Sequence, residues 1–569
     1  MTIEDRYEKA RRIHLSGDLA GAAAGYGAIL AQAPDHAAAE AGLGVIALQT
    51  GRLSDALLHL SRAHDRAPDD AKIANNLGNT RLALGRIEEA LQAFNAAVHA
   101  DPELLDARYN RGVAQQRLNR RAEAEADYLA VLESDQSRMD AAVNLAAVYR
   151  AAEDPHAAIQ VLESALQRVG PQDDALLSLA ALLETVGDTN GSANALAALS
   201  KARRNDPQAV LTRARLALRA GDPDGGLETL RSLPADAPDQ ARRQAHYLSG
   251  LLLDKAGRID EAFAAFTAGN NAMRASRANA DQMANRYLRR IDDYRSLLTS
   301  APSLPPPETA FPFSLVFFCG FPRSGTTLME QILEAHPETV TTGEDSPLQH
   351  LYEEALPTPP AGRNIDAHFL ANLDASARDS LRRTFRSIVE RQKGDIAGRT
   401  LIDKLPLNLI ELGVIARLFP DAKVLVALRD PRDCVLSGFM QPFRLNDAMA
   451  CFLDLDRVAS TYAAVMDLYA AQKDTCGLPI EEYRYEDLID DFDGTVRRVI
   501  AFLGLNWHDD IANYRNRLAG RYIATPSYIA VTKGLNRQAI GRWRRYEHQM
   551  TPILPVLAPF AARFGYDSQ

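Results

Sequence analysis

A short glycine-bounded loop in the second half of the sequence has the composition of an anion-binding loop. The run 314–319 is apolar after its first serine, as in a buried parallel strand. Gly320-Phe-Pro-Arg-Ser-Gly325-Thr-Thr327 follows directly, and an amphipathic helix is expected over 328–335. The loop amides and the helix dipole of such a unit point at one anionic group. The expected binding residues are Pro322, Arg323, Ser324, Gly325, Thr326 and Thr327.

The loop departs from the nucleotide-binding pattern GxxxxGK[ST] at one position. Thr326 stands where that pattern has a lysine that reaches the β- and γ-phosphates of a triphosphate. The missing lysine argues against an enzyme that hydrolyses ATP or GTP, and a kinase is the least favoured enzyme class. A positive charge lies inside the loop instead, as Arg323.

A second candidate anion site lies further along the chain. The apolar run 423–428 is typical of another buried strand, and Arg429 follows it at once. Ser437 lies inside the helix that is expected next, so the two side chains can converge on a phosphate. Two anion sites on one parallel sheet indicate a nucleotide phosphorylated at two positions. The structural alternative for Arg429 is an ion pair with Asp430 or Asp433.

The elements that must position these residues form an α/β domain with a central parallel sheet. The segment 300–312, with five prolines in thirteen residues, is expected to be an extended and fairly stiff connector before it. A helix is expected over 270–299. The predicted organisation is a multidomain chain with a helical repeat over 1–270, a helix and proline-rich linker over 271–311, and the α/β domain over 312–569.

The first half of the chain repeats with a period of 34 residues, as Pro34, Pro68 and Pro102 show. In a helix–turn–helix unit the glycine serves the turn, the small residue lets two helices approach, and the large apolar residue fills the gap between units. The turn glycine is absent at Asn119 and Glu153. The pattern resembles the tetratricopeptide repeat, with seven or eight units in an all-α solenoid. The residues in register are Gly17, Gly51, Gly85; Ala10, Gly44, Gly78, Gly112, Ala146; Tyr26, Leu60, Phe94, Tyr128 and Leu162.

Three asparagines form a ladder on the first helices of successive repeats: Asn76, Asn110 and Asn144. In tetratricopeptide repeats this position faces the concave groove, where amides can hold the backbone of an extended peptide. The alternative is that these asparagines are exposed polar residues or make hydrogen bonds between helices. The ladder therefore marks a candidate groove for a peptide or protein partner.

Charge and cysteine content exclude several classes. Lys plus Arg number 64 and Asp plus Glu 74, a net charge of −10 that divides into −5 before and −5 after residue 300. Neither half is a basic nucleic-acid module. The four cysteines form no CxxC pair and no zinc-ligand spacing, so neither a disulfide scaffold nor a metal is expected. The first residues are acidic and no apolar run has the length of a membrane span, so a cytoplasmic location is expected.

The second half resembles the sulfotransferase family over about 312–569. Pro322-Arg-Ser-Gly-Thr-Thr327 is similar to that family's loop for the 5′-phosphosulfate, and Arg429-Asp-Pro-Arg with Ser437 is similar to its 3′-phosphate site. The resemblance implies 3′-phosphoadenosine 5′-phosphosulfate (PAPS) as the donor of a sulfuryl group, with no required metal. The motifs are most similar to those of tyrosylprotein sulfotransferases, which implies transfer to an acceptor hydroxyl on a peptide or protein.

The same resemblance assigns further residues. Ile402-Asp-Lys-Leu-Pro406 is similar to the family's segment with the catalytic lysine, which places that role on Lys404. Tyr485 matches a tyrosine that packs on the adenine, and Ser527 and Lys533 match residues that contact the nucleotide. Arg323 and Lys404 would stabilise the charge that develops during transfer.

The general base is expected in the acidic segment Gly343-Glu-Asp345, which follows His336 with one residue more than the family pattern. Glu344 is preferred over Asp345. A histidine base is the alternative, with His336 and His350 as candidates, but neither fits better than the carboxylate. The base would take the acceptor's proton as the sulfuryl group is transferred.

Two other functions stay open at this point. The same chemistry could serve a glycan, a lipid or a small molecule, with the repeats as a scaffold for protein partners. A domain that binds nucleotide but is catalytically silent is the other possibility, although the set of Arg323, Lys404, Arg429 and Ser437 argues against it.

Overall fold

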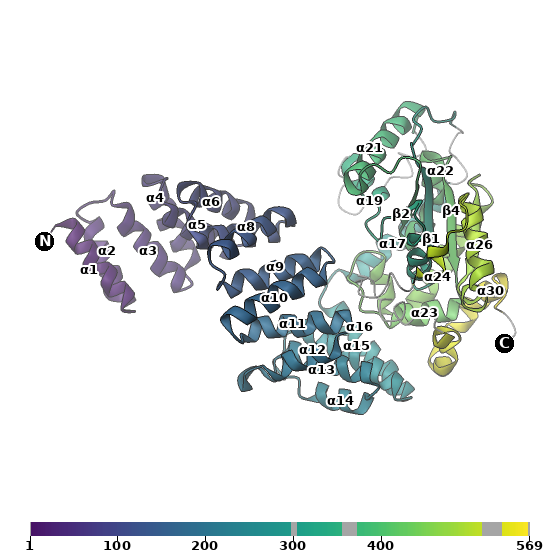
Figure 1. Cartoon of the computed structure of the whole chain (residues 1–569), viewed down its shortest axis with the longest axis horizontal. Helices are drawn as coiled ribbons and strands as arrows, with labels where there is room; N and C mark the ends of the chain where they lie inside the picture. The colour runs from purple at the N-terminus through teal and green to yellow at the C-terminus, as the bar shows by residue number, and fades with distance from the viewer. Residues whose placement is uncertain (1, 298–303, 356–372, 515–536, 567–569) are drawn as a thin grey trace. The chain divides into compact units, whose positions relative to one another are not determined.

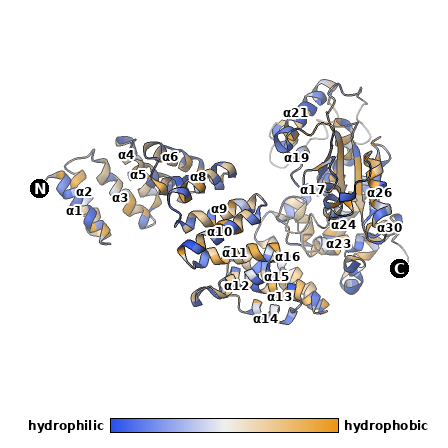
Figure 2. Cartoon of the chain, viewed as in Figure 1, coloured by the Kyte–Doolittle hydropathy of each residue, from blue (hydrophilic) through white to orange (hydrophobic). Residues whose placement is uncertain are grey.

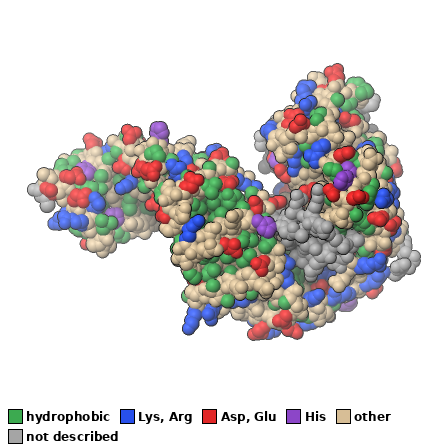
Figure 3. Space-filling view, in the orientation of Figure 1, with side chains coloured by type: hydrophobic (Ala, Val, Ile, Leu, Met, Phe, Trp, Pro, Cys, Tyr) green, Lys and Arg blue, Asp and Glu red, His purple; other side chains and the backbone are tan. Residues whose placement is uncertain are grey.

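The computed structural model describes residues 2–297, 304–355, 373–514 and 537–566 (Figure 1). The chain divides into two compact units, Met1–Arg204 and Asn205–Gln569. Acidic and basic side chains lie interspersed over the face shown in Figure 3, as the small net charge of each half predicts.

The first unit is built from antiparallel helix pairs, and within its described residues it contains no strand. Each pair corresponds to one period of the sequence repeat. The helices are α1 (Ile3–Leu15), α2 (Leu19–Leu30), α3 (Ala37–Gln49), α4 (Leu53–Arg66), α5 (Ala71–Ala83), α6 (Ile87–Ala100), α7 (Leu105–Arg117), α8 (Arg121–Ser134), α9 (Met139–Ala151), α10 (Pro155–Val169), α11 (Asp173–Val186) and α12 (Thr189–Ala197), followed by the 3₁₀ turn η1 (Lys201–Arg203).

The small and large residues of the repeat meet inside one helix pair. A Cβ added to Gly78 on α5 would lie 2.4 Å from Cε1 of Phe94 on α6, and one added to Gly112 would lie 2.8 Å from Tyr128. Both aromatic side chains are fully buried. Phe94 shares a core with Ala114 of the next unit, and Tyr128 shares one with Leu145 of the next unit. Each large residue therefore packs on the glycine of its own unit and also reaches the gap between units, as the sequence predicts.

The turn between the paired helices is left-handed whether or not it holds a glycine. Gly17, Gly51 and Gly85 have φ values of 89°, 73° and 76°. Asn119 and Glu153, where the glycine is absent, have φ values of 59° and 62°. The turn geometry is thus a property of the repeat, and Glu153 adopts it at a steric cost that glycine avoids.

Replacing Glu153 with Gly is expected to stabilise the protein by about 0.5–1 kcal/mol. The left-handed conformation costs a non-glycine residue about 1–2 kcal/mol, and the greater backbone entropy of glycine in the unfolded chain offsets about half of this. Urea denaturation followed by circular dichroism measures the change. Glu153→Ala is the control, since alanine keeps the strain, and an equal gain in both variants would contradict the explanation.

The second unit begins with further helix pairs and a long single helix. The sequence predicted one helix over 270–299, and this was wrong: α16 ends at Ala275 and α17 begins at Ala280. Ser276 ends α16, and its hydroxyl donates to the carbonyl of Met273 at 2.7 Å. The helices are α13 (Pro207–Ala220), α14 (Pro223–Arg231), α15 (Asp239–Lys255), α16 (Ile259–Ala275) and α17 (Ala280–Leu297).

A five-stranded parallel sheet follows, with the order β2-β3-β1-β4-β5. Figure 2 shows its strands as mostly hydrophobic, in accord with sheets that are covered on both faces. In the register of the sheet, Phe318 pairs with Lys404 and Gly320 with Ala427, so β1, β3 and β4 end at one edge. The strands are β1 (Ser314–Gly320), β2 (Thr339–Thr341), β3 (Thr400–Lys404), β4 (Lys423–Leu428) and β5 (Ile480–Arg484).

Two hydrophobic cores cover the two faces of the sheet. Leu315, Phe317 and Cys319 belong to one core with α17, α21 and α24, whereas Val316 and Phe318 belong to the other with α18 and α26. This alternation is the period of two expected of a strand. The remaining elements are α18 (Thr326–Glu334), α19 (Pro347–Ala355), α21 (Ala375–Lys393), η2 (Pro406–Glu411), α22 (Leu412–Leu418), α23 (Pro431–Phe439), η3 (Met449–Leu453), α24 (Leu455–Lys473), α25 (Tyr485–Asp490), α26 (Phe492–Leu503), η4 (Asp509–Ile511), η5 (Arg537–Ala539), η6 (Arg542–Tyr546), α29 (Glu547–Met550) and α30 (Leu554–Arg563).

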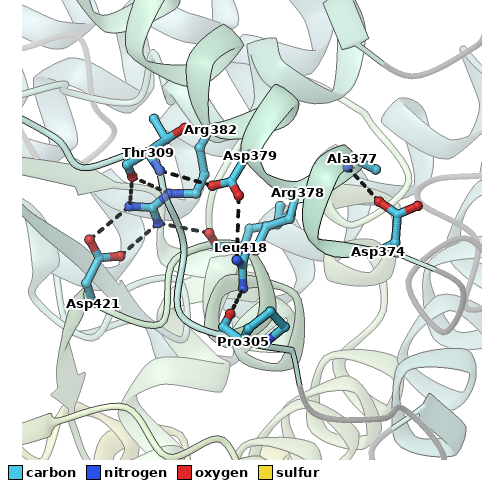
Figure 4. A network of polar contacts seen from close by, with 9 residues as sticks. All are labelled: Pro305, Thr309, Asp374, Ala377, Arg378, Asp379, Arg382, Leu418 and Asp421. Carbon is cyan, nitrogen blue, oxygen red and sulfur yellow. Dashed lines mark hydrogen bonds and ion pairs between the residues drawn. The ribbon is translucent and has the colours of Figure 1, made fainter.

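The described part of the proline-rich connector is bound to the α/β domain by two buried arginines of α21 (Figure 4). Arg382 donates to the carbonyl of Thr309 at 2.8 and 3.0 Å and to both carboxylate oxygens of Asp421. Arg378 donates to the carbonyl of Pro305. Proline has no backbone N–H, so a proline-rich segment cannot satisfy its carbonyl oxygens within itself. The two arginines supply the missing donors and hold the connector against α21.

Candidate functional site

The loop after β1 adopts the conformation of an anion-binding loop. Arg323 and Gly325 have φ values of 76° and 96°, and α18 begins at the next residue, Thr326. A Cβ on Gly320 would lie 2.6 Å from Oγ of Ser324, and one on Gly325 would lie 2.5 Å from the ring of Tyr485. Glycine is therefore required at both ends of the loop.

Arg429 joins the second anion site to this loop. Its Nη1 donates to the carbonyl oxygen of Arg323 at 2.9 Å, and its Nη2 donates to the carbonyl of Ala539. Nε of Arg323 in turn donates to Oγ of Ser437 on α23 at 3.1 Å. The two elements that the sequence placed at the ends of two strands thus lie side by side.

The two carboxylates considered as ion-pair partners of Arg429 accept hydrogen bonds from other groups. Asp430 accepts two hydrogen bonds from Arg432, at 2.7 and 2.9 Å. Asp433 accepts from the backbone amides of Gly541 and Trp543, at 2.6 and 2.9 Å. Both carboxylates are therefore engaged elsewhere, and the hydrogen bonds that Arg429 donates from its two Nη atoms go to carbonyl oxygens.

Two buried polar atoms at this place fit an anion. Nε of Arg429 and Oγ of Ser324 are buried, and neither has a hydrogen-bond partner among the residues that the structure describes. Burial and the nearby charge of Arg429 lower the pKa of Arg323 to about 10, which leaves it protonated at neutral pH. A buried guanidinium nitrogen without a partner, next to a second guanidinium group, is an electrostatic arrangement that a phosphate would relieve.

A buried lysine and two glutamates form a second cluster at the same sheet edge. Lys404, at the end of β3, is fully buried, and its Nζ lies 3.1 Å from Oε2 of Glu330 and 3.4 Å from Oε1 of Glu344. Glu330 is buried on α18, whereas 51% of the Glu344 side chain is exposed. Burial raises the pKa of Glu330, and the charge of Lys404 opposes this rise. Glu330 was missed by the sequence reasoning, although a charge among the apolar residues of 328–335 could have indicated it.

The two candidate bases differ in their contacts. Glu344 reaches Lys404, whereas Asp345 lies 2.6 Å from Nε2 of His350 and 3.3 Å from Nε2 of Gln392. His336 uses both ring nitrogens: Nδ1 accepts from the amide of Glu338 and Nε2 lies 2.8 Å from the carbonyl of Asn506. The geometry therefore favours Glu344 over the other three residues.

Asp403 fixes the segment that follows Glu344. Its Oδ2 accepts from Oγ of Ser346 at 3.1 Å and from the amide of Leu348 at 3.3 Å. Burial raises the pKa of Asp403 to about 7. Because Asp403 precedes Lys404 on β3, these bonds hold the acidic segment next to the lysine.

Tyr485 lies directly after β5, and its ring packs on the loop. The guanidinium carbon of Arg429 is 4.9 Å from the ring centroid, within the range of a cation–π contact. Tyr485 thus lies at the edge of the candidate site. Ser527 and Lys533, the other two residues assigned by resemblance, lie outside the described residues.

Models of known families match most of the chain in sections. The sulfotransferase family matches residues 315–509. Models of the tetratricopeptide repeat match residues 14–79, 78–119, 109–175 and 211–272. The chain carries tetratricopeptide repeats and a sulfotransferase domain. Its fold class is that predicted from the sequence.

Curated relatives match parts of the chain at modest identity. An uncharacterised protein of Aquifex aeolicus is 28% identical over 357 residues, which cover 58% of this chain and 43% of that protein. This chain thus spans less than half of the Aquifex protein that it matches. Protein-tyrosine sulfotransferase 1 of Danio rerio is 28% identical over 265 residues, 44% of this chain and 72% of that enzyme. The crystal structure of PilW, a type IV pilus biogenesis factor, covers 34% of this chain and 90% of its own at 22% identity, with a TM-score of 0.32.

The asparagine ladder of the tetratricopeptide repeats is half-buried and internally bonded. Nδ2 of Asn110 donates to Oδ1 of Asn75 at 3.0 Å, and Nδ2 of Asn144 donates to the hydroxyl of Tyr109 at 2.9 Å. Each bond joins the first helices of adjacent repeats. These bonds are the alternative considered for the ladder.

The described residues contain no group of three or more His, Cys, Asp or Glu side chains placed to hold a metal ion. Among the same residues, no helix combines the length and the apolar character needed to cross a bilayer. All four cysteines are free thiols, and Cys319 and Cys434 are buried. Burial raises the pKa of both thiols, which fits a packing role beside the sulfotransferase loop.

Proposed function

We propose that this protein transfers the sulfuryl group of PAPS to an acceptor hydroxyl on a peptide or protein. One observation carries the proposal: the unsatisfied donors of Ser324 and Arg429 lie at the ends of adjacent strands, beside Arg323 and the buried Lys404. A nucleotide with phosphates at two positions supplies the two anionic groups that such a place requires. The sulfotransferase match and the names of the relatives support this donor.

The roles of the residues follow from where charge develops. The loop from Pro322 to Thr327 would hold the 5′-phosphosulfate through its amides, and Arg429 with Ser437 would hold the 3′-phosphate. Tyr485, Ser527 and Lys533 would complete the nucleotide site. A dry, preorganised cation stabilises developing negative charge strongly, and the buried Lys404, at the end of the strand that pairs with β1, is such a cation.

Glu344 would act as the general base. As the bond from the acceptor oxygen to sulfur forms, the bond from sulfur to the 5′-phosphate oxygen breaks, and the acceptor's proton passes to the Glu344 carboxylate. The exposure of half of the Glu344 side chain allows a large acceptor to reach it. Its contact with Lys404 keeps the carboxylate next to the site of transfer.

A direct assay tests the proposed function. The full chain is incubated with PAPS that carries ³⁵S, together with tyrosine peptides, phenols, sugars and a lipid extract, and labelled products are separated. Label on tyrosine peptides supports the proposal. Label on sugars, lipids or phenols alone would place the acceptor in another class, and donor binding without any product would show a catalytically silent domain.

Replacing Asn110 with Ala tests the peptide groove. The variant is expected to lower kcat/KM for a peptide acceptor by about threefold to tenfold, the value of one or two backbone hydrogen bonds, and to leave a small phenol unaffected. Asn75→Ala is the matched control, because it breaks the same Asn75–Asn110 bond but keeps the ladder amide. Equal effects of the two variants would refute a role for the ladder in acceptor binding.

A further inference from the structure

A basic segment near the end of the chain lies against the second anion site. The segment 541–545 reads Gly-Arg-Trp-Arg-Arg, and Gly541 and Trp543 donate their backbone amides to the carboxylate of Asp433 on α23. The carbonyl of Ala539, just before it, accepts from Arg429. The backbone of this segment is therefore fixed on both sides of Arg542, next to the arginine of the second anion site.

Asp254, in the last turn of α15, contacts two arginines of this segment and the tyrosine that follows it. Its Oδ2 lies 3.0 Å from Nη2 of Arg542, and its Oδ1 accepts from the hydroxyl of Tyr546 at 2.7 Å. Nη2 of Arg545 donates to the backbone carbonyl of Asp254 at 2.7 Å. The Asp254 side chain is only 14% exposed. The last pair of repeat helices thus positions the basic segment.

The same helix pair also supports α23. Nδ2 of Asn270 on α16 donates to the carbonyl of Phe439, the last residue of α23, at 3.0 Å. The hydroxyl of Tyr247 on α15 donates to Oδ1 of Asn270 at 2.6 Å, and the rings of Phe263 and Phe439 stack at 5.2 Å. Ser437 lies on α23. The last repeat therefore contacts both α23 and the segment 541–545, the two elements next to Arg429.

Arg542 adds a third positive charge to the place where Arg323 and Arg429 meet. The charge of Arg542 is near enough to lower the pKa of Arg323, in addition to burial and the charge of Arg429. Asp254 pairs with Arg542 through a single guanidinium nitrogen. A guanidinium offers five N–H donors, so an arginine held in this way retains donors for a second acceptor.

We propose that Arg542 is a further donor-binding residue, that it contacts the phosphate held by Arg429 and Ser437, and that Asp254 of the last repeat is its positioning residue. The inference rests on the proposed function, because the ligand is the adenosine 3′,5′-bisphosphate part of PAPS. It also gives the repeats a second role: the helix pair α15–α16 is part of the donor site's framework.

Calorimetric titration of the full chain with adenosine 3′,5′-bisphosphate and with 5′-AMP tests this assignment. Arg542→Ala is expected to raise the Kd for the bisphosphate by about 10- to 100-fold, as expected for a hydrogen bond to a charged group, and the Kd for 5′-AMP by less than about twofold. Asp254→Asn is expected to raise the bisphosphate Kd by about threefold. The double variant is expected to match Arg542→Ala alone, since Asp254 acts through Arg542.

Arg545→Ala is the matched control. Arg545 contacts the same Asp254 but is half exposed, and its removal is expected to leave both Kd values unchanged. If Arg542→Ala binds the bisphosphate as the wild type does, or loses both ligands equally, the assignment is overturned. If the wild type itself does not bind the bisphosphate, the proposed function falls and the assignment with it. A purely structural Arg542 would lower Tm without changing the ratio of the two Kd values.

Discussion

Replacing Lys404 with Met is expected to lower kcat for sulfuryl transfer by about 10²- to 10³-fold, the cost of losing one preorganised donor to a developing negative charge. The effect is expected to be large because Lys404 is fully buried, where a charge interacts strongly and no water can replace it. The measurement is single-turnover transfer of ³⁵S from PAPS to the peptide acceptor identified in the assay above. The Kd of the donor product separates binding from chemistry.

The variant also leaves the buried Glu330 without its ion-pair partner. Loss of one partner of a buried ion pair lowers the free energy of unfolding by about 3–5 kcal/mol. The double variant Lys404→Met with Glu330→Gln removes that unpaired carboxylate and is expected to regain most of the lost Tm. Its kcat is expected to stay low. Lys423→Met, on the same sheet but bonded to the carbonyl of Phe502, is the control for removing a lysine from a strand. A double variant with more than about a tenth of the wild-type rate would show that Lys404 is structural.

Replacing Glu344 with Gln is expected to lower kcat by about 10²- to 10⁴-fold, the usual contribution of a general base. The amide of glutamine preserves the size of the side chain and an oxygen that can accept from Lys404, so the fold and donor binding are expected to be unchanged. Single-turnover kinetics at saturating donor and acceptor measure the effect. Wild-type Kd for adenosine 3′,5′-bisphosphate in the variant would confirm that the loss lies in the chemical step.

Asp345→Asn is the matched control, since it makes the same change one residue later. Asp345 is bonded to His350 and Gln392, so we expect its loss to change kcat by less than about threefold. A large loss in Asp345→Asn with little loss in Glu344→Gln would exchange the two assignments. Equal and large losses would indicate that the whole acidic segment has moved.

The sequence predicted those parts of the site that are local along the chain. Strand, loop and helix are contiguous from Ser314 to Glu334, so their pattern is visible without any alignment. The end of β4 with Arg429 and the following helix is equally local. The α/β class and the helical repeat follow from the same kind of pattern, since each repeat carries its own turn and its own pair of small and large residues.

The contacts that the sequence did not predict join residues far apart in the chain. Glu330 and Lys404 meet because α18 and β3 are adjacent in the fold, and no spacing in the sequence indicates it. Asp254 lies in a repeat helix, and Arg542 lies close to the last helices of the chain. In the sequence, neither residue can be told apart from a charged residue exposed to solvent. The helix expected over 270–299 was wrong because a serine that bonds its own helix carbonyl ends α16, a signal weaker than a proline or glycine.

The contacts of α21 with the connector determine which fragments of the chain keep the α/β domain intact. A fragment that began at residue 312, where the sequence predicts that the α/β domain begins, would lack the carbonyls of Pro305 and Thr309. Arg378 and Arg382 would then be left with fewer acceptors, and the core beneath α17 would be uncovered. A fragment that begins at Asn205 keeps all these contacts. A fusion that joins the α/β domain to another protein therefore has to include the last repeats.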